Sequence, residues 1–335
     1  MSVGVRSDPE VLLAAARAGD QGALARLISA IERGGSGARA VARLATGTSP
    51  PYTLGLTGAP GAGKSTITNE LITEVRRGWP RDGAGREPVD AIAVLAVDPS
   101  SPFSGGAILG DRVRMQAHAT DPSVFIRSMA TRGHLGGLTL AVPDALRLLG
   151  AAGLPVAIIE TVGVGQMEVE VAGSADTTAV VVTPGWGDAM QANKAGLLEI
   201  ADIFVINKAD RPGVHQARHD LEQMLDLTVA SDWRPPIVET TGSTGEGVEV
   251  LWGEVARHRA HLETSGRLEV VRAERLSREL RRIISARVAA GVEDLAGGED
   301  FAAALLGVQQ GTLDPYDAAD RLLTAAWPQM VAETP

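Results

Sequence analysis

The sequence predicts a doubly wound α/β fold, in which helices cover both faces of a mostly parallel sheet, with helical extensions at the two ends. Three observations support this prediction. From Tyr52 onward, short apolar segments of strand length alternate with segments of helical pattern. Several of the short segments are apolar throughout, which is typical of parallel strands buried on both faces. Aromatic residues make up only 3% of the chain, so we expect a core of Val, Ile, Leu and Ala.

Two helices are expected before the sheet. Asp8 and Pro9 are typical of an N-cap and a first-turn proline. Asp20 is expected to cap a second helix, which ends at the glycines of Gly34 to Gly37. We expect residues 1–50 to form an N-terminal helical extension. The apolar residues on one face of the second helix are Leu24, Leu27, Ile28 and Ile31.

The sheet domain is expected over residues 51–262. Its expected strands are Thr53–Thr57, Ala91–Val97, Val124–Arg127, Val156–Glu160, Ala179–Thr183, Ile203–Asn207 and Ile237–Glu239. Its expected helices are Ser65–Arg77, Leu138–Leu149, Ala189–Leu198 and Gln216–Leu225. The stretch Pro80–Pro88 is rich in Gly, Pro and charge and is expected to be a flexible insert.

After about Gly247 the pattern becomes helical. The expected helices are Val248–Glu263, Leu268–Ala290, Phe301–Val308 and Tyr316–Trp327. In the second of these, apolar residues recur at helical spacing: Leu276, Leu280, Ile283 and Ile284. We expect residues 263–335 to form a C-terminal helical region that holds a homodimer; the alternative is that this apolar face packs on the sheet domain.

Composition limits the possible partners. Lys and Arg total 31 against 41 Asp and Glu, a formal charge of -10, which argues against binding nucleic acid or an anionic membrane. No apolar run approaches the roughly 18 residues of a membrane span. The chain has no cysteine, which excludes disulfides, thiolate metal sites and cysteine catalysis. We expect a cytoplasmic protein.

A glycine-rich segment with a lysine follows the first expected strand. Residues 58–65 read GAPGAGKS and match GxxxxGK[ST] between a strand and a helix. Its backbone N–H groups can turn inward around phosphate oxygens. Lys64 can reach the β- and γ-phosphates, and the Ser65 hydroxyl can bind Mg²⁺. The sequence therefore predicts a P-loop nucleotide site.

A second motif specifies the base. Residues 207–210 read NKAD at the end of an expected strand. The Asp210 carboxylate can accept hydrogen bonds from both guanine N1–H and the exocyclic amine. Adenine lacks this pair of donors, so the motif predicts GTP and GDP as ligands.

Acidic residues end two further strands. Glu160 opens the segment ETVGVGQ, and Gly163 follows it at the spacing expected near a γ-phosphate. Ras-like GTPases have DxxG here, so this pattern indicates a different branch; a Glu that caps the sheet edge is the alternative. Asp98 opens the segment DPSSPFSGGAILGDRVRM, in which Asp111 begins a basic helix. Such a loop is a candidate switch that approaches the metal, the alternative being a surface loop.

The segment FIRSMATRGHLGGL offers three further candidates. Arg127, Arg132 and His134 could contact phosphate or a partner. A single histidine is more often structural than catalytic.

Together these segments resemble the MeaB/ArgK family of GTPases, which includes the human methylmalonic aciduria type A protein. The resemblance extends from about Leu54 to Gly247 and rests on GAPGAGKST, VDPSSPFSGGAILGDRVRM, FIRSMATRGHLGGL, IIETVGVGQ and NKAD in the family's order. It implies a chaperone that binds an adenosylcobalamin-dependent acyl-CoA mutase, gates cofactor loading by its GTP state, and protects or reactivates the mutase. It also implies a homodimer.

The resemblance assigns roles to residues of this chain. It implies that Asp98, Asp111 and Glu160 bind Mg²⁺ and organise water, together with Ser65. We expect catalysis to depend on Lys64, Asp98 and Glu160. The implied nucleotide contacts are Gly58, Ala59, Pro60, Gly61, Ala62, Gly63, Lys64, Ser65, Thr66, Gly163, Asn207, Lys208, Asp210, Thr241 and Gly242.

The chain departs from the family pattern at two places. Thr241 and Gly242 replace the usual SA pair beside guanine, where backbone N–H groups can serve instead. The segment Gly185–Lys194, which matches the family's mobile signalling segment, has one lysine where many relatives have two. The second departure bears on which partner protein the chain binds, and not on nucleotide binding.

Three other functions are compatible with parts of the pattern. A kinase-like ATPase of amino-acid transport is disfavoured by NKAD. A metal-insertion GTPase usually has His-rich or Cys-rich sites, whereas the six histidines here are scattered. A non-catalytic scaffold is disfavoured by the intact Lys64 and Ser65.

Overall fold

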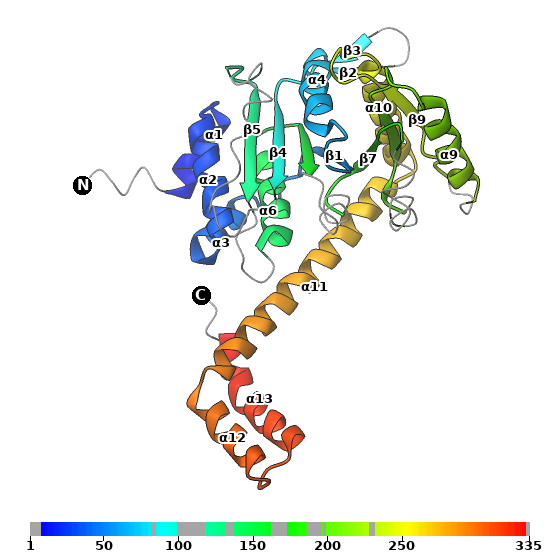
Figure 1. The fold of residues 1–335 in the computed structure, drawn as a ribbon. Helices are drawn as coiled ribbons and strands as arrows, with labels where there is room; N and C mark the ends of the chain where they lie inside the picture. Colours follow the sequence, from blue (N-terminus) through cyan, green and yellow to red (C-terminus); the bar gives the residue numbers. More distant parts are fainter. Residues whose placement is uncertain are drawn as a thin grey trace. The chain divides into compact units, whose positions relative to one another are not determined.

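The computed structural model describes residues 8–81, 85–98, 118, 120–130, 137–161, 173–185, 196, 199–227 and 232–332. These residues fall into two compact units that divide within one long helix, after Arg275. The first unit contains the sheet and the second consists of helices (Figure 1).

Seven strands of the described residues form one sheet in which every pairing is parallel. The strand order is β5-β4-β6-β1-β7-β8-β9, so consecutive strands are often separated by crossovers. The central strands are buried along their whole length, as their unbroken apolar sequences predicted. The strands are β1 (Tyr52–Gly58), β4 (Ile92–Asp98), β5 (Val124–Ala130), β6 (Val156–Thr161), β7 (Thr177–Val182), β8 (Ile203–Asn207) and β9 (Ile237–Thr240).

Helices cover both faces of the sheet, which confirms the doubly wound fold. On one face, α4 (Lys64–Arg77) and α10 (Val248–Thr264) share a core with Leu54, Leu56 and Ile158. On the other face, α6 (Gly137–Ala151) packs on β4 and β6, and α9 (Val214–Asp226) packs on β7 and β8. Neighbouring residues of a strand point to opposite faces, so Ile158 and Ile159 enter different cores.

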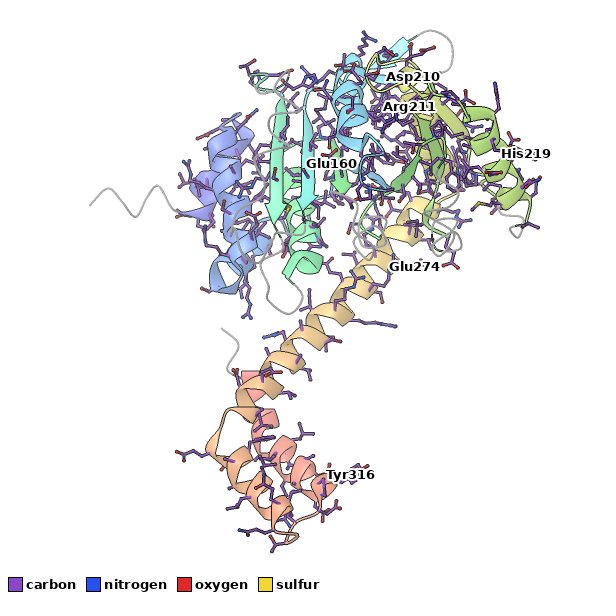
Figure 2. The ribbon with its side chains drawn as sticks, viewed as in Figure 1. Glu160, Asp210, Arg211, His219, Glu274 and Tyr316 are labelled. Carbon is purple, nitrogen blue, oxygen red and sulfur yellow. The ribbon has the colours of Figure 1, made fainter. Side chains whose placement is uncertain are left out.

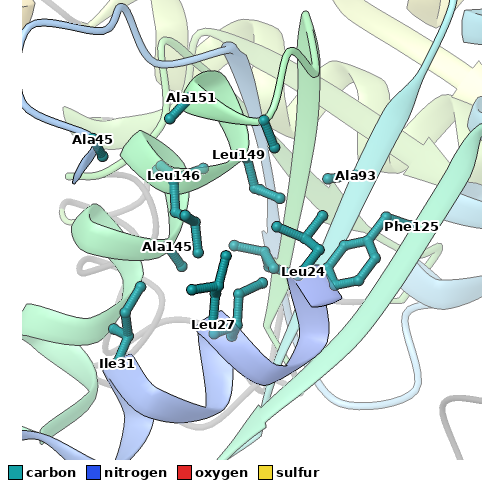
Figure 3. Close-up of a cluster of buried hydrophobic side chains, with 14 of the residues drawn as sticks. Leu24, Leu27, Ile31, Ala45, Ala93, Phe125, Ala145, Leu146, Leu149 and Ala151 are labelled. Carbon is teal, nitrogen blue, oxygen red and sulfur yellow. The ribbon is translucent and has the colours of Figure 1, made fainter. Parts of the chain in front are cut away.

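The N-terminal helices α1 (Pro9–Arg17), α2 (Gln21–Arg33) and α3 (Gly35–Leu44) lie beside β5 in Figure 1. Both predicted caps are present: the Asp8 carboxylate accepts from Glu10 N, and the Asp20 carboxylate from Ala23 N at 2.9 Å. The apolar face of α2 packs against α6 and the sheet, as Figure 3 shows for Leu24, Leu27 and Ile31. The apolar pattern of α2 therefore predicted its buried face.

Helix α3 was not predicted. The glycines at 34–37 indicated a helix end, and Gly34 does end α2, but Gly35 already begins the next helix. Both glycines have φ of 71°, so the chain reverses there without a loop. Burial of Val41 and Ala45 in the α2–α6 core holds α3 in place.

The predicted flexible insert contains a short hairpin. Strands β2 (Trp79–Arg81) and β3 (Gly85–Glu87) pair antiparallel. The Trp79 ring stacks on Trp252 of α10 with centroids 4.1 Å apart, and Trp252 Nε1 donates to Gly78 O at 3.0 Å. The Gly and Pro content suggested a loop, whereas an aromatic contact from α10 fixes the segment.

The C-terminal helices are α11 (Arg267–Ala296), α12 (Glu299–Gln309) and α13 (Pro315–Ala332). Helix α11 carries an exposed apolar row at four-residue spacing, which we call the α11 stripe. Between 37% and 59% of the surface of each of its residues is exposed: Leu276, Leu280, Ile284, Val288 and Val292. No helix among the described residues has the length and hydropathy needed to span a membrane.

A buried carboxylate attaches the start of α11 to the sheet. Asp176, with 1% of its side chain exposed, precedes β7 and accepts from Thr53 N of β1 at 3.0 Å. Arg272 donates to both of its oxygens, and Arg275 Nη1 donates at 3.2 Å. Burial tends to lower the pKa of Arg272, but its contacts with Asp176 raise it overall.

A chain of polar groups lies next to this anchor. Tyr52 OH and Thr177 Oγ1 are 2.5 Å apart, and Thr177 Oγ1 lies 2.8 Å from His258 Nδ1. His258 Nε2 lies 3.4 Å from Asp202 Oδ1. Burial raises the pKa of Asp202 from 3.8 to about 7, while burial followed by repulsion from His261 lowers the pKa of His258 from 6.5 to about 4.

These two shifts act in opposite directions on stability. Ionisation of Asp202 destabilises the folded state as the pH rises from 3.8 toward 7. Protonation of His258 destabilises it as the pH falls from 6.5 through 4. Asp202 keeps 33% of its side chain exposed against 4% for His258, so we expect the histidine to dominate. The charges of Arg267 and Asp176 also affect both pKa values: Arg267 lowers each of them and Asp176 raises each of them.

We predict that Asp202→Asn makes stability more sensitive to acid. Between pH 7 and 4 its free energy of unfolding should fall more steeply than that of the wild type, because the opposing Asp202 titration is gone. His258→Gln should instead give a shallower fall. Urea unfolding at several pH values measures both slopes, and identical slopes for the two variants would refute the prediction.

Candidate functional site

The glycine-rich segment forms a tight loop between β1 and α4. Three of its glycines have positive φ: Gly58 at 137°, Gly61 at 74° and Gly63 at 92°. A Cβ on Gly58 would lie 2.1 Å from Val181 O of β7, and one on Gly63 would lie 2.3 Å from Asn207 Nδ2. Only glycine fits at these two positions, because the loop lies directly against β7 and the end of β8.

The lysine of the loop is held over its own backbone. Lys64 Nζ donates to Gly58 O at 2.5 Å and to Ala59 O at 3.0 Å, and the residue is 6% exposed. Ser65 and Thr66 follow it in the first turn of α4. The amino end of a helix attracts anions because its first N–H groups lack partners within the helix. The Lys64 ammonium group and the amino end of α4 therefore lie together at the place where a phosphate is expected to bind.

Asn207 connects the loop to two further segments. Its Nδ2 donates to Ala62 O at 2.7 Å, and its Oδ1 accepts from Gly242 N at 3.0 Å and from Thr240 Oγ1 at 3.2 Å. Asn207 is 2% exposed, so these bonds are shielded from water. Within the described residues, the predicted nucleotide-binding Asn207 thus joins the P-loop to the segment after β9.

The next residues continue this connection. Lys208 has φ of 61°, and its Nζ donates to Gly61 O at 2.7 Å. It is the only non-glycine residue of the described chain with positive φ, a conformation that is uncommon and concentrated at functional sites. Asp210, labelled in Figure 2, follows in a turn and is exposed. Asp210 thus lies two residues after the lysine that contacts the P-loop.

The segment after β9 closes this side of the site. Thr241 and Glu246 form a bridge, with Thr241 N donating to Glu246 O at 2.9 Å. Gly242 lies between Asn207 Oδ1 and Ile67 of α4, where an added Cβ would be 3.3 and 3.2 Å away. The predicted contacts Thr241 and Gly242 are thus brought next to the P-loop.

A buried carboxylate lies at the end of β6. Glu160 is 2% exposed, and its Oε2 accepts from Thr68 Oγ1 at 2.6 Å (Figure 2). It pairs in register with Leu56 of β1 and Ala96 of β4. Asp98 is the last residue of β4, adjacent to the end of β6. The ends of β1, β4 and β6 therefore bring the P-loop, Asp98 and Glu160 to one edge of the sheet.

Several predicted residues lie outside the described residues. These are Asp111, Gly163, Arg132 and His134, together with most of the predicted segment Gly185–Lys194 and of the helix Ala189–Leu198.

Arg127 has a different role from the one predicted. Its Nη2 donates to Glu32 Oε2 at 2.5 Å and to Ser29 Oγ at 2.9 Å. The guanidinium thus ties α2 to β5 and is not directed at a phosphate. Only the fold could reveal this, because Glu32 lies in a helix distant in sequence.

Sequence reasoning missed Thr68. The residue is fully buried and contacts the carboxylate predicted to bind metal. The available signal was its spacing: it comes four residues after Lys64, and residues four apart share a face of a helix.

The arrangement fits a magnesium nucleotide. Gly58 and Gly63 cannot accept a Cβ, the Lys64 amine lies at a helix amino end, and a buried carboxylate lies on the adjacent strand. Oxygen ligands of this kind suit Mg²⁺. Together with the parallel sheet, these features define a P-loop nucleotide-binding protein, and NKAD at the end of β8 places it among GTPases.

The chain belongs to the MeaB family. The family model described as methylmalonyl Co-A mutase-associated GTPase MeaB matches residues 24–295. The resemblance noted in the sequence is thereby confirmed.

Relatives from several organisms agree with this assignment. A Pyrococcus abyssi protein is 47% identical over 312 residues, covering 91% of this chain and 93% of its own. The GTPase ArgK of Escherichia coli is 38% identical over 272 residues, covering 78% of each chain. A crystal structure of an LAO/AO transport system kinase aligns with a TM-score of 0.67 at 27% identity, covering 96% of this chain and 97% of that one.

One relative is a fusion. The fused isobutyryl-CoA mutase of Cupriavidus metallidurans is 39% identical over 211 residues. This match covers 62% of the present chain and only 18% of the fused protein.

We predict that Gly63→Ala abolishes nucleotide binding, because its Cβ would displace Asn207 and break the link to Gly242. Gly61→Ala is the matched control: Gly61 also has positive φ, but an added Cβ meets nothing within 4 Å. It should show only the backbone strain, about 1–2 kcal/mol. Binding of a fluorescent GDP analogue measures both. Equal losses of affinity in the two variants would contradict the proposed role of Asn207.

Proposed function

We propose that this GTPase binds and hydrolyses GTP to regulate an adenosylcobalamin-dependent acyl-CoA mutase. It would gate loading of the mutase cofactor and protect or reactivate the mutase. The mutase would be methylmalonyl-CoA mutase or a close relative. The observation that carries the proposal is the fusion: a segment homologous to this chain is part of a protein named as an isobutyryl-CoA mutase. In the fused protein, the mutase and the segment similar to this chain form one polypeptide. This supports an association between the two proteins where they are encoded as separate chains.

Each part of the site would have a distinct task in this function. Residues 58–66 would surround the phosphates, with Lys64 neutralising their charge. Ser65, Asp98, Asp111 and Glu160 would hold Mg²⁺, which offsets charge on the phosphate oxygens when bound. Asp210 would select guanine, with Thr241 and Gly242 beside the base. Asn207 and Lys208 would keep the base and phosphate segments in register through their bonds to Ala62 and Gly61.

Catalysis in such a site would depend on charge stabilisation and positioning. Phosphoryl transfer has little covalent chemistry for the protein to perform, so preorganised charges lower the barrier. Lys64 is already positioned by two carbonyls, and Glu160 by a hydroxyl. Lys64 would then meet the phosphate, and Glu160 the magnesium ion, without large rearrangement.

The segments that follow β4, β6 and β7 would carry the signal to the mutase. All three begin at the sheet edge that bears the P-loop, where a γ-phosphate and its Mg²⁺ can order loops. The mutase must bind the GTP and GDP states with different affinity for this signal to exist.

A second copy of this chain would cover the α11 stripe. Five exposed apolar residues at constant spacing form one row along α11, which is the pattern of a helix that packs against another helix. The proposed homodimer would bury this row.

We predict that the protein binds GDP and GTP with Mg²⁺ and binds ATP at least a hundredfold more weakly. Asp210→Asn should shift the preference from guanine to xanthine nucleotides, because an amide offers a donor to the xanthine carbonyl. Calorimetry of the wild type and of Asp210→Asn with GDP, GTP, ATP and XDP, each with Mg²⁺, measures these affinities. Tight ATP binding by the wild type would instead favour the kinase-like alternative suggested by the name of the structural relative.

We predict that a cobalamin-dependent acyl-CoA mutase from the same cell forms a complex whose affinity differs at least fivefold between GDP and a non-hydrolysable GTP analogue. Each candidate mutase is mixed with the protein, and complex formation, cofactor loading and retained mutase activity are measured. Gly63→Ala serves as the control that cannot respond to nucleotide. If binding and loading are the same with either nucleotide, the regulatory role is refuted.

A further inference from the structure

Thr68 forms a short hydrogen bond with Glu160. Its Oγ1 lies 2.6 Å from Glu160 Oε2, and both residues are at most 2% exposed. A hydroxyl that donates to a carboxylate makes a charge-assisted bond, about twice as strong as a neutral one. Loss of the hydroxyl removes this bond from a buried carboxyl group. Thr68 therefore helps to set the orientation of the Glu160 carboxylate.

The same hydroxyl is held by its own helix. Thr68 Oγ1 lies 3.0 Å from Lys64 O, the carbonyl one turn earlier in α4. The single hydroxyl proton cannot serve both acceptors fully, and the shorter distance is to the carboxylate. The position of the oxygen, however, is fixed by the helix in either case.

Lys64 and Thr68 lie four residues apart, so they share a face of α4. Lys64 Nζ is directed to the P-loop carbonyls, and Thr68 Oγ1 to the carboxylate of β6. One helical face thus determines both the position of the amine that meets phosphate and the orientation of the acid that meets metal. The intervening residue Ser65, at the start of this turn, carries the expected magnesium hydroxyl.

We propose that Thr68 is a positioning residue for the magnesium site: it orients the Glu160 carboxylate relative to the P-loop and so sets the affinity for the Mg²⁺ that accompanies the nucleotide. This inference rests on the proposed function, in which Glu160 helps to hold that ion. The proposed role of Thr68 acts through Glu160 and requires no direct contact with nucleotide or metal.

The test separates magnesium from nucleotide. Binding of a fluorescent GDP analogue is titrated over a range of Mg²⁺ concentrations and also in EDTA. Thr68→Val, which has nearly the same shape but no hydroxyl, should raise the Mg²⁺ concentration at half-maximal effect by tenfold or more. Its GDP affinity in EDTA should stay within twofold of the wild type. Thr68→Ser, which keeps the hydroxyl, should stay close to the wild type in both.

Thr57→Val is the matched control. Thr57 is also fully buried, lies next to the loop, and contacts the Thr161 hydroxyl at 3.5 Å instead of Glu160. It should leave the magnesium dependence unchanged. If Thr68→Val does not fold, Thr68→Ala removes the same hydroxyl without placing a second methyl group beside the carboxylate.

A double variant identifies the route of the effect. In a Glu160→Gln background, Thr68→Val should change the magnesium dependence by less than twofold, because the carboxylate it orients is gone. Independent, additive effects would overturn the inference, as would a Thr68→Val protein with the magnesium dependence of the wild type. If the wild type itself shows no magnesium-dependent GDP binding, the proposed function fails first.

Discussion

The candidate site depends on the amide of Asn207. This one buried side chain donates to the P-loop at Ala62 and accepts from the segment after β9 at Gly242. Both halves of an amide are needed: a carboxylate would lack the donor, and an apolar residue would leave a buried carbonyl and a buried N–H without partners. Gly63 must lack a Cβ because Asn207 Nδ2 occupies the space. The P-loop and the segment after β9, proposed to bind phosphate and base, are therefore joined through one side chain, and the sequence of each is constrained by the other.

At the opposite edge of the sheet, where the strands begin, a buried carboxylate takes the place of the Asn207 amide as the central group. There the acceptor is Asp176, which collects Thr53 N of β1 and two arginines of α11. Breaking a buried ion pair typically costs about 3–5 kcal/mol, since it leaves an uncompensated charge. Strand β7 starts at this anchor and, at Val181, its carbonyl lies against the P-loop at Gly58. The same strand is thus held at both ends by contacts that tolerate little displacement, which gives the site a rigid frame.

The sequence predicted the parts of this molecule that are determined locally. Continuous apolar runs identified the parallel strands, Asp8 and Asp20 identified helix starts, and the spacing of glycines and Lys64 identified the loop. It did not predict features that arise from distant residues. Helix α3 follows two glycines and is held by the core, the hairpin at Trp79 depends on Trp252, and Arg127 pairs with Glu32 in α2. The contact of Thr68 in α4 was missed for the same reason, because its partner Glu160 lies on β6, distant in sequence.

Three residues of the candidate site are held firmly by the surrounding frame, and this bears on the proposed signalling. Lys64, Asn207 and Glu160 are buried and each is held by at least one hydrogen bond from another part of the frame. In the proposed function, groups held in this way would set the position of the nucleotide, and other elements would report its state to a partner. A ligand shifts an equilibrium only through an element that has two arrangements of different affinity. The proposed function therefore requires such an element outside the frame, and the carboxyl ends of the strands are where the chain leaves the frame beside the P-loop. Under that proposal, family members that differ in partner should differ in the sequences that follow Asp98, Thr161 and Gly185, with Asn207 unchanged.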